Sequence, residues 1–108
     1  MSNVSVETLE NLKESMVGRR YKHFKGRTYV VTDIAVHTES NEIMVIYKCF
    51  ADPLVTWCRP LSMFASDVDR KKYPNVKQKR RFEPLSKIQE KSDEQRQGHF
   101  NHVYKRRK

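Results

Sequence analysis

The chain has 108 residues, which is enough for one domain with short extensions and excludes a multidomain architecture. Its longest uninterrupted apolar run, Ile43 to Tyr47, is far shorter than the ~20 residues of a membrane helix, so we expect no membrane segment. The formal net charge is +9, and a surplus of this size suggests an acidic partner, such as nucleic acid or an acidic protein surface.

The first element, Ser5–Val17, is predicted to be an amphipathic helix. Ser5 can cap it by accepting a hydrogen bond from a backbone N–H, and Gly18 is placed to end it. We expect its apolar face to pack on the domain, with docking to a partner as the alternative. Four apolar residues share that face because they recur at three- and four-residue spacing: Val6, Leu9, Leu12 and Met16.

Short apolar runs separated by turn signals follow, and this pattern predicts an antiparallel meander that closes into a small barrel. Thr28–Val36 carries the strongest strand signal because six of its residues are β-branched. Pro60 ends the last run, and Leu61–Phe64 is predicted to be a helical turn that plugs the barrel end. The predicted strands are Tyr21–Phe24, Thr28–Val36, Ile43–Phe50 and Trp57–Arg59.

The positive charge is concentrated in the C-terminal part of the chain. Residues 1–66 carry eight basic and seven acidic side chains, a net of +1, whereas residues 67–108 carry fourteen and six, a net of +8. The basic run Lys77–Phe82 is interpreted as a last strand that returns to the sheet. Pro84–Gln97 has helical composition, with proline in the first turn, and the tail after it is expected to be disordered when free.

Several separated motifs resemble the DUF1653 family, small bacterial and phage proteins of unknown biochemical function. The motifs are Tyr21-Lys22-His23-Phe24-Lys25-Gly26, Tyr29, Ala35-Val36-His37-Thr38-Glu39-Ser40, Val45, Tyr47, Trp57-Cys58-Arg59-Pro60-Leu61-Ser62-Met63-Phe64 and Arg81-Phe82. The resemblance covers roughly residues 18–83. It implies a small antiparallel, SH3-like β-barrel and carries over no catalytic or ligand residue. The chain departs from the pattern by an extra arginine after Gly18, by Cys58 at a usually aliphatic position, and by its two extensions.

The predicted fold class is therefore mainly β with flanking helices. The N-terminal helix occupies residues 1–18, the β-barrel domain residues 19–83, and the basic C-terminal helix and tail residues 84–108. The N-terminus has no basic-then-apolar leader, so no secretory signal is visible and a cytoplasmic location is expected.

Cys49 and Cys58 fall on consecutive predicted strands, where they could be near neighbours. In a reducing compartment we expect two buried or half-buried thiols rather than a disulfide. A zinc site would need two further ligands, such as His23 and His37, and no C-x-x-C pair exists, so no metal and no other cofactor is predicted.

His37 and Glu39 form the one polar pair that could act as a general acid and base, because residues two apart in a strand share a face. No nucleophile or glycine-rich phosphate loop accompanies them. The alternative is a hydrogen-bonded turn in which both side chains hold the loop geometry. We expect the protein not to be an enzyme; a hydrolase that uses these two residues is the competing hypothesis.

Trp57 and Arg59 should lie on the same sheet face, opposite Cys58. With Tyr21 and Tyr29 they could form a surface that stacks on bases or on a peptide. The favoured alternative for Trp57 is a place in the core, because burial suits its large side chain. Arg59 would then pair with Glu39 or Asp33.

Basic residues interleaved with aromatic ones recur in three places, which suggests electrostatic contact with RNA or DNA without a known sequence-reading motif. The predicted function is a non-enzymatic nucleic-acid-binding module. The alternative is a protein-docking regulator or inhibitor of a host enzyme or nucleoprotein complex, with phage origin as one source. The predicted contact residues are Arg19, Arg20, Lys22, Lys25, Trp57, Arg59, Lys77, Lys79, Arg80, Arg81, Tyr104, Lys105, Arg106, Arg107 and Lys108.

Overall fold

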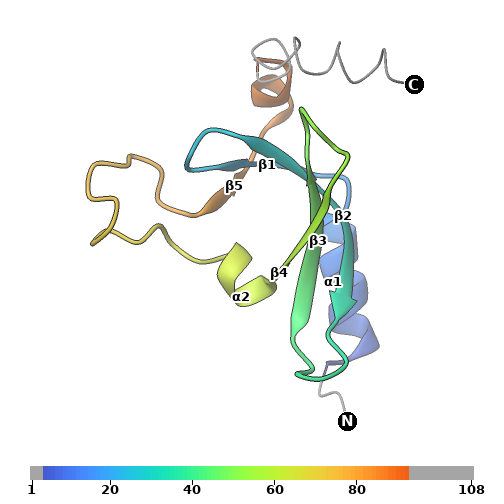
Figure 1. Cartoon of the computed structure of the whole chain (residues 1–108). Coiled ribbons are helices and arrows are strands. Elements are labelled where there is room, and N and C mark those ends of the chain that lie inside the picture. The colour runs from blue at the N-terminus through green and yellow to red at the C-terminus, as the bar shows by residue number, and fades with distance from the viewer. Residues whose placement is uncertain (1–3, 93–108) are drawn as a thin grey trace.

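The computed structural model describes residues 4–92, and in this part of the chain five antiparallel strands form one sheet with short helices around it (Figure 1). The predicted mainly-β class with flanking helices is confirmed. The elements are α1 (Val6–Met16), β1 (Arg20–His23), β2 (Thr28–Val36), β3 (Ile43–Cys49), β4 (Thr56–Pro60), α2 (Leu61–Phe64) and β5 (Phe82–Pro84), and residues 87–92 are also helical.

The sheet has the strand order β4-β3-β2-β1-β5. Its centre is the hairpin of β2 and β3, in which a bulge shifts the register between Val31 and Asp33. Because the bulge adds one residue, Val31 and Ile34 both point into the core although they are three positions apart. The tighter turn between β1 and β2 uses Gly26, whose φ of 110° is a conformation that residues with a Cβ rarely adopt.

Helix α1 packs alongside β2, as its amphipathic pattern predicts. The Ser5 hydroxyl accepts a hydrogen bond from the backbone N–H of Thr8 at 3.1 Å and caps the helix as expected. Met16 is buried, and Leu9 and Leu12 pack partly buried against the core. Val6 is 72% exposed, so its predicted place on the buried face is wrong; it lies in the first turn, beyond the edge of the packed surface.

An aromatic cluster ties the two ends of the sheet together. Phe64 of α2 stacks on Phe82 of β5 with 4.1 Å between ring centroids and 6° between planes. Tyr47 of β3 meets both rings edge-on, at 5.5 and 5.6 Å, and Tyr21 of β1 meets Phe64 at 5.2 Å. All four side chains are buried, so the cluster joins α2 to three strands through apolar contact.

The sheet is not closed into a barrel, which corrects that part of the expected fold. β4 and β5 are its two edges and do not pair. β4 ends at Pro60, where the chain turns into α2, and the three-residue β5 ends at Pro84. A proline has no N–H to donate, so at these positions neither edge strand can offer that hydrogen bond to a further strand. The predicted helical turn at Leu61–Phe64 does form, and Phe64 fills the space between the two edges.

The segment between α2 and β5 extends from one side of the sheet (Figure 1) and is held by its own hydrogen bonds. The Arg70 guanidinium donates to the carbonyls of Val76 and Gln78, and the Gln78 side chain donates to the Lys22 carbonyl of β1 at 2.8 Å. Val68 is buried. These contacts attach residues 65–81 to the domain.

The chain after this segment differs from the prediction at Pro84. The basic run does return to the sheet, but the strand begins at Phe82, and Pro84 pairs with Tyr21 in β5 instead of opening a helix. An edge strand tolerates proline because the missing N–H faces outward. The helix starts at residue 87, directly after Ser86. The Ser86 hydroxyl accepts the backbone N–H of Gln89 at 3.2 Å, and the Gln89 side chain accepts the backbone N–H of Ser86 at 2.8 Å. The rest of the predicted helix, and the tail, lie outside the described residues.

None of the helices found between residues 4 and 92 has the length and apolar character that crossing a bilayer requires.

The aromatic cluster predicts where the domain is most sensitive to substitution. Phe64→Ala removes a side chain that is 2% exposed and leaves a cavity beside Phe82 and Tyr47. We expect the free energy of unfolding to fall by about 3–5 kcal/mol, measured by urea denaturation. Met63→Ala is the matched control, because Met63 is the preceding residue and is 45% exposed. Equal losses in the two variants would contradict the cluster's role.

Candidate functional site

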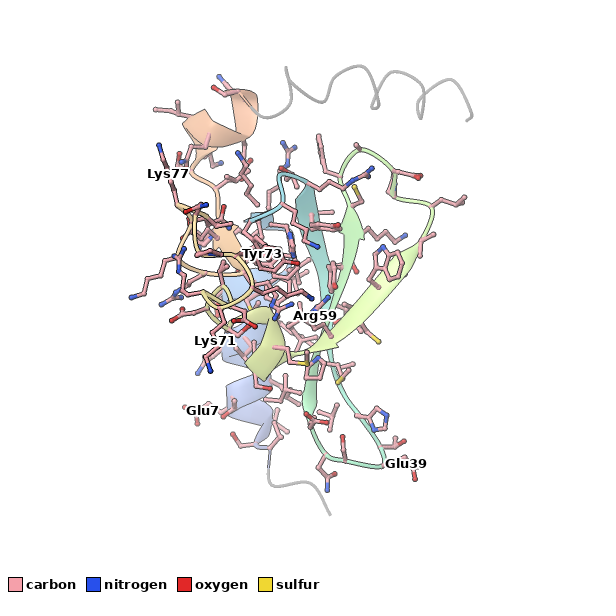
Figure 2. The ribbon with its side chains drawn as sticks, turned by 60° about the vertical axis from the view of Figure 1, so that its left-hand side comes forward. Glu7, Glu39, Arg59, Lys71, Tyr73 and Lys77 are labelled. Carbon is pink, nitrogen blue, oxygen red and sulfur yellow. The ribbon has the colours of Figure 1, made fainter. Side chains whose placement is uncertain are left out.

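A hollow of about 320 Å³ lies between the sheet and the 65–81 segment, and we call it the basic pocket. It combines residues from the β1–β2 turn, from β4, and from both ends of the segment that leads to β5. Figure 2 shows two of them, Arg59 and Tyr73, on the same side of the sheet, and Glu39 at the far tip of the β2–β3 hairpin. The lining residues are His23, Phe24, Lys25, Arg59, Asp69, Lys72, Tyr73 and Arg81.

Aromatic contacts hold these segments against each other. The rings of Phe24 and Tyr73 meet at 4.9 Å, which docks the 65–81 segment onto the turn after β1. The Lys25 ammonium lies 5.4 Å from the centre of the Tyr73 ring, and the Lys72 ammonium lies 5.8 Å from it. Both lysines that line the pocket therefore lie close to Tyr73.

The pocket is strongly cationic. Its lining contains four basic side chains and one carboxylate, Asp69. Oδ1 of Asp69 already accepts the backbone N–H groups of Lys71 and Lys72, at 3.0 and 3.4 Å. Within residues 4–92 the ion pair that the structure contains is Lys13–Asp33, at 3.5 Å, so none of the pocket's cations is neutralised in this part of the chain.

Arg59 and Arg81 are each oriented by one hydrogen bond from the side-chain Nε. Arg59 donates from Nε to the Tyr47 hydroxyl at 3.3 Å, and Arg81 donates from Nε to the Ser66 hydroxyl at 3.2 Å. Their terminal Nη groups have no acceptor among residues 4–92. Such planar donor pairs match the oxygen spacing of carboxylates and phosphates. Asp33 pairs with Lys13 and Glu39 contacts Thr38, so the pairing of Arg59 with Asp33 or Glu39, one of the two alternatives for Arg59, does not occur in residues 4–92.

His23 forms the inner wall of the basic pocket. Its ring stacks on Phe24 at 4.5 Å and meets Phe82 edge-on at 4.8 Å. Burial, followed by the charges of Arg59, Arg81 and Lys25, lowers the pKa of the imidazole from 6.5 to about 4. Nδ1 accepts the Lys25 backbone N–H at 3.1 Å, so in the neutral ring the proton is on Nε2. At neutral pH the ring is thus an uncharged hydrogen-bond donor among cations.

A second hollow, of about 200 Å³, adjoins the basic pocket through Arg59, and we call it the aromatic groove. It is lined by Tyr29, Tyr47, Trp57 and Arg59. Trp57 is 51% exposed, so its predicted place in the core is wrong: β4 is an edge strand, and no layer covers the side chain at this end of the sheet. Beyond Trp57 the surface continues into a further hollow of about 280 Å³ beside Arg27 and Val55.

Trp57 and Arg59 share a face of β4, as expected, but Tyr21 does not lie beside them. Trp57 and Arg59 line the same hollow, and Tyr29 joins them. Tyr21 does not, because it is buried against Phe64. Cys49 is a buried free thiol, as expected, whereas Cys58 is exposed, because β4 has no further strand to cover it.

The predicted contact residues divide into separate groups. The basic pocket and aromatic groove bring together Lys25, Trp57, Arg59 and Arg81. Arg20 lies elsewhere, over the Phe50 ring at 4.0 Å, and Arg19 lines a wider hollow at the end of α1 where acidic and basic side chains mix. In Figure 2, Lys77 lies on the outer side of the 65–81 segment. Lys22 sits in β1, and Lys79 and Arg80 precede β5. The members Tyr104, Lys105, Arg106, Arg107 and Lys108 lie outside the described residues.

His37 and Glu39 do not form an acid–base pair in this structure. Nδ1 of His37 accepts the backbone N–H groups of Glu39 and Ser40, each at 3.2 Å. The Glu39 carboxylate contacts the Thr38 hydroxyl at 3.5 Å. This is the hydrogen-bonded turn of the alternative interpretation, and it lies away from the basic pocket (Figure 2).

Sequence reasoning missed five of the eight residues that line the basic pocket: His23, Phe24, Asp69, Lys72 and Tyr73. The last three belong to a stretch in which the sequence analysis predicts no helix, strand or contact residue. The signal that could have identified them is the tyrosine within Arg70-Lys71-Lys72-Tyr73, which repeats the basic–aromatic pattern found elsewhere in the chain. His23 was considered as a metal ligand and as part of the basic–aromatic run Arg19–Lys25, but not as a contact residue in its own right. No cluster of three or more His, Cys, Asp or Glu residues suited to a metal ion occurs in residues 4–92.

The pKa of His23 predicts how stability depends on pH. The imidazole titrates near 6.5 in the unfolded chain and near 4 in the folded one, so protonation favours unfolding. The contribution of the neutral ring is complete above pH 6.5 and is lost as the pH falls from about 6.5 to about 4. We expect the free energy of unfolding, from urea denaturation at a series of pH values, to decline over this window.

His23→Gln should decline less over the same window, because glutamine does not titrate. His37→Gln is the control and should keep the wild-type decline, because His23 is still present. A decline that is the same in all three proteins would contradict the assignment to His23.

Comparisons with known proteins identify the family of the chain. No curated protein and no solved structure matches it. The model of the family described as protein of unknown function (DUF1653) matches residues 19–84, from just before β1 to the end of β5. The match therefore spans the strands, the basic pocket and the aromatic groove, and the chain belongs to the DUF1653 family.

Proposed function

We propose that this protein is a non-enzymatic module that binds single-stranded nucleic acid, RNA or DNA, across the basic pocket and the aromatic groove. The observation that carries the proposal is that one side chain, Arg59, lines both hollows. An exposed tryptophan and four cations therefore border this two-part depression. His37 and Glu39 are assigned to hairpin geometry in this proposal.

The chemistry of the depression suits a strand whose bases are unpaired. Cations bind the backbone phosphates and release counterions, which makes the affinity fall with salt. Aromatic faces stack on exposed bases irrespective of sequence, with ~1–3 kcal/mol per base. Trp57 supplies the most accessible face, and Tyr29 lines the same groove. In a duplex the bases are stacked on each other, so this arrangement favours a single strand.

Two further expectations from the sequence, the SH3-like arrangement of the strands and the cytoplasmic location, are part of this proposal. The SH3-like arrangement is supported by five short antiparallel strands with a helical turn between the last two, and by Phe82, which reaches Tyr47 from the opposite edge. A reducing, cytoplasmic location is supported by the two free cysteines, one buried beside Arg27 and one exposed.

Docking to an acidic protein surface is the second candidate function. It is favoured by two exposed apolar residues in the β3–β4 loop, Leu54 and Val55, which are 74% and 46% exposed and lie close in sequence to Trp57. Affinity purification with and without nuclease separates the two functions. A partner that survives nuclease treatment supports docking, whereas loss of the bound material supports nucleic-acid binding.

Trp57 provides a direct test because it is the only tryptophan of the chain. Titration with a short single-stranded oligonucleotide should quench its fluorescence as a base stacks on the indole. Trp57→Ala should weaken binding by roughly 5- to 150-fold, which corresponds to the loss of ~1–3 kcal/mol of stacking. Fluorescence anisotropy of a labelled oligonucleotide measures this loss without relying on the tryptophan.

Cys58→Ala is the matched control, because Cys58 is the next residue of β4, is exposed, and lines none of these hollows. It should bind like the wild type. Unquenched Trp57 fluorescence at saturating oligonucleotide, or equal affinities of the two variants, would contradict binding through the groove.

We expect the basic residues of Tyr104–Lys108 to add a purely electrostatic contribution to the affinity for a single strand. A plot of log affinity against log salt concentration should have a slope of ~0.7 per phosphate contacted for a single strand. Deletion of Tyr104–Lys108, which removes four basic residues, should reduce that slope. An unchanged slope would show that the tail takes no part in binding.

A further inference from the structure

We infer that the basic pocket binds the terminal phosphate of the strand, a phosphomonoester, while the adjoining base lies on Trp57. This inference rests on the proposed function and adds that the protein prefers a strand with a phosphorylated end. An internal phosphodiester would otherwise be the default ligand of a cationic nucleic-acid site. The charge and the donors of the pocket favour the terminal group, and its shape can accommodate that group.

The shape argument concerns how a strand can leave the pocket. Phe24 and Tyr73, in contact at 4.9 Å, form one wall, and Lys25 and Lys72 flank that wall. Arg59 lines both this hollow and the aromatic groove, so a strand that leaves past Arg59 reaches Trp57. An internal phosphate needs room for chain on both of its sides, whereas a terminal phosphate needs only one way out.

The charge argument concerns the number of cations. Four basic side chains surround a space whose one carboxylate is engaged by the backbone of its own loop. A phosphomonoester carries a charge of about −1.5 to −2 at neutral pH. A diester carries a single negative charge and one fewer free oxygen. A site with this surplus of positive charge therefore gains more from the monoester.

The donors come from three separate segments. The free Nη groups of Arg59 and Arg81 can each present two N–H groups to phosphate oxygens. His23 adds Nε2–H, because its Nδ1 accepts the Lys25 backbone N–H at 3.1 Å. The charged groups that act on His23 from the surrounding elements are Arg59 of β4, Arg81 before β5 and Lys25 of the β1–β2 turn, and Asp69 shares its pocket. A bound dianion would offset these cations and favour the imidazolium.

The test compares three short single-stranded oligonucleotides of one sequence: one with a 5′-phosphate, one with a 3′-phosphate, and one with hydroxyl groups at both ends. Titration of the full chain at neutral pH and constant salt gives each affinity from the quenching of Trp57. We expect one phosphorylated oligonucleotide to bind about tenfold more tightly or better than the hydroxyl form, as new hydrogen bonds to charged groups imply. The preferred end gives the polarity of the strand.

Two neighbouring lysines test the location. Lys72→Gln removes a cation that lines the pocket, whereas Lys71→Gln removes one from the same exposed loop that does not line it. Lys72→Gln should lose most of the preference for the phosphorylated end, and Lys71→Gln should keep it. Because both substitutions remove one positive charge from the surface, equal effects would attribute the preference to net charge and overturn the site.

The histidine gives an independent readout. The pKa of His23, followed by NMR of the imidazole protons, should rise when the phosphorylated oligonucleotide binds and should stay near its free value with the hydroxyl form. Equal affinity of all three oligonucleotides would overturn the terminal-phosphate site and leave the proposed function standing. Absence of binding to all three would overturn both.

Discussion

The stacking of Phe64 on Phe82 is the contact on which the rest of the domain depends. It joins α2 to β5 although the two residues are separated by the whole 65–81 segment, and Tyr47 packs against both rings. With the two ends of that segment fixed, its hydrogen bonds to β1 and the contact of Tyr73 with Phe24 can form. The basic pocket is thus a consequence of the core, because the core brings its walls together.

The same arrangement explains the electrical character of the pocket. Lys25, Arg59, Lys72 and Arg81 come from separate parts of the chain and would repel one another without the apolar contacts beneath them. His23 lies where those contacts and those charges meet, and it remains neutral because both burial and the neighbouring cations disfavour its charged form. The four cations of the basic pocket form no ion pair with a carboxylate in residues 4–92, and they lie next to the exposed side chain of Trp57.

Part of the positive charge of the chain lies within the domain. The net charge does rise after residue 66, but the cations between residues 67 and 81 belong to the domain. Arg70 holds two carbonyls of its own loop, Arg81 is oriented by Ser66, and Gln78 attaches the loop to β1. Charge composition alone could not distinguish a folded loop from a tail, because both are polar and both lie at the surface.

The sequence by itself determined the local structure. β-Branched residues specify β2, a short apolar run specifies β3, Ser5 specifies the start of α1, and Pro60 specifies the end of β4, because each effect acts within a few residues. Only the tertiary structure decided that Pro84 continues a strand, that the sheet stays open, and that Trp57 faces solvent. Those outcomes depend on which strand lies at an edge and on which side chains meet across long stretches of chain, such as Phe24 with Tyr73. Only part of the candidate site could be predicted from the sequence, for the same reason. Trp57 and Arg59 alternate on one strand, whereas Lys72, Tyr73 and Arg81 come close to them only through the packing of the chain.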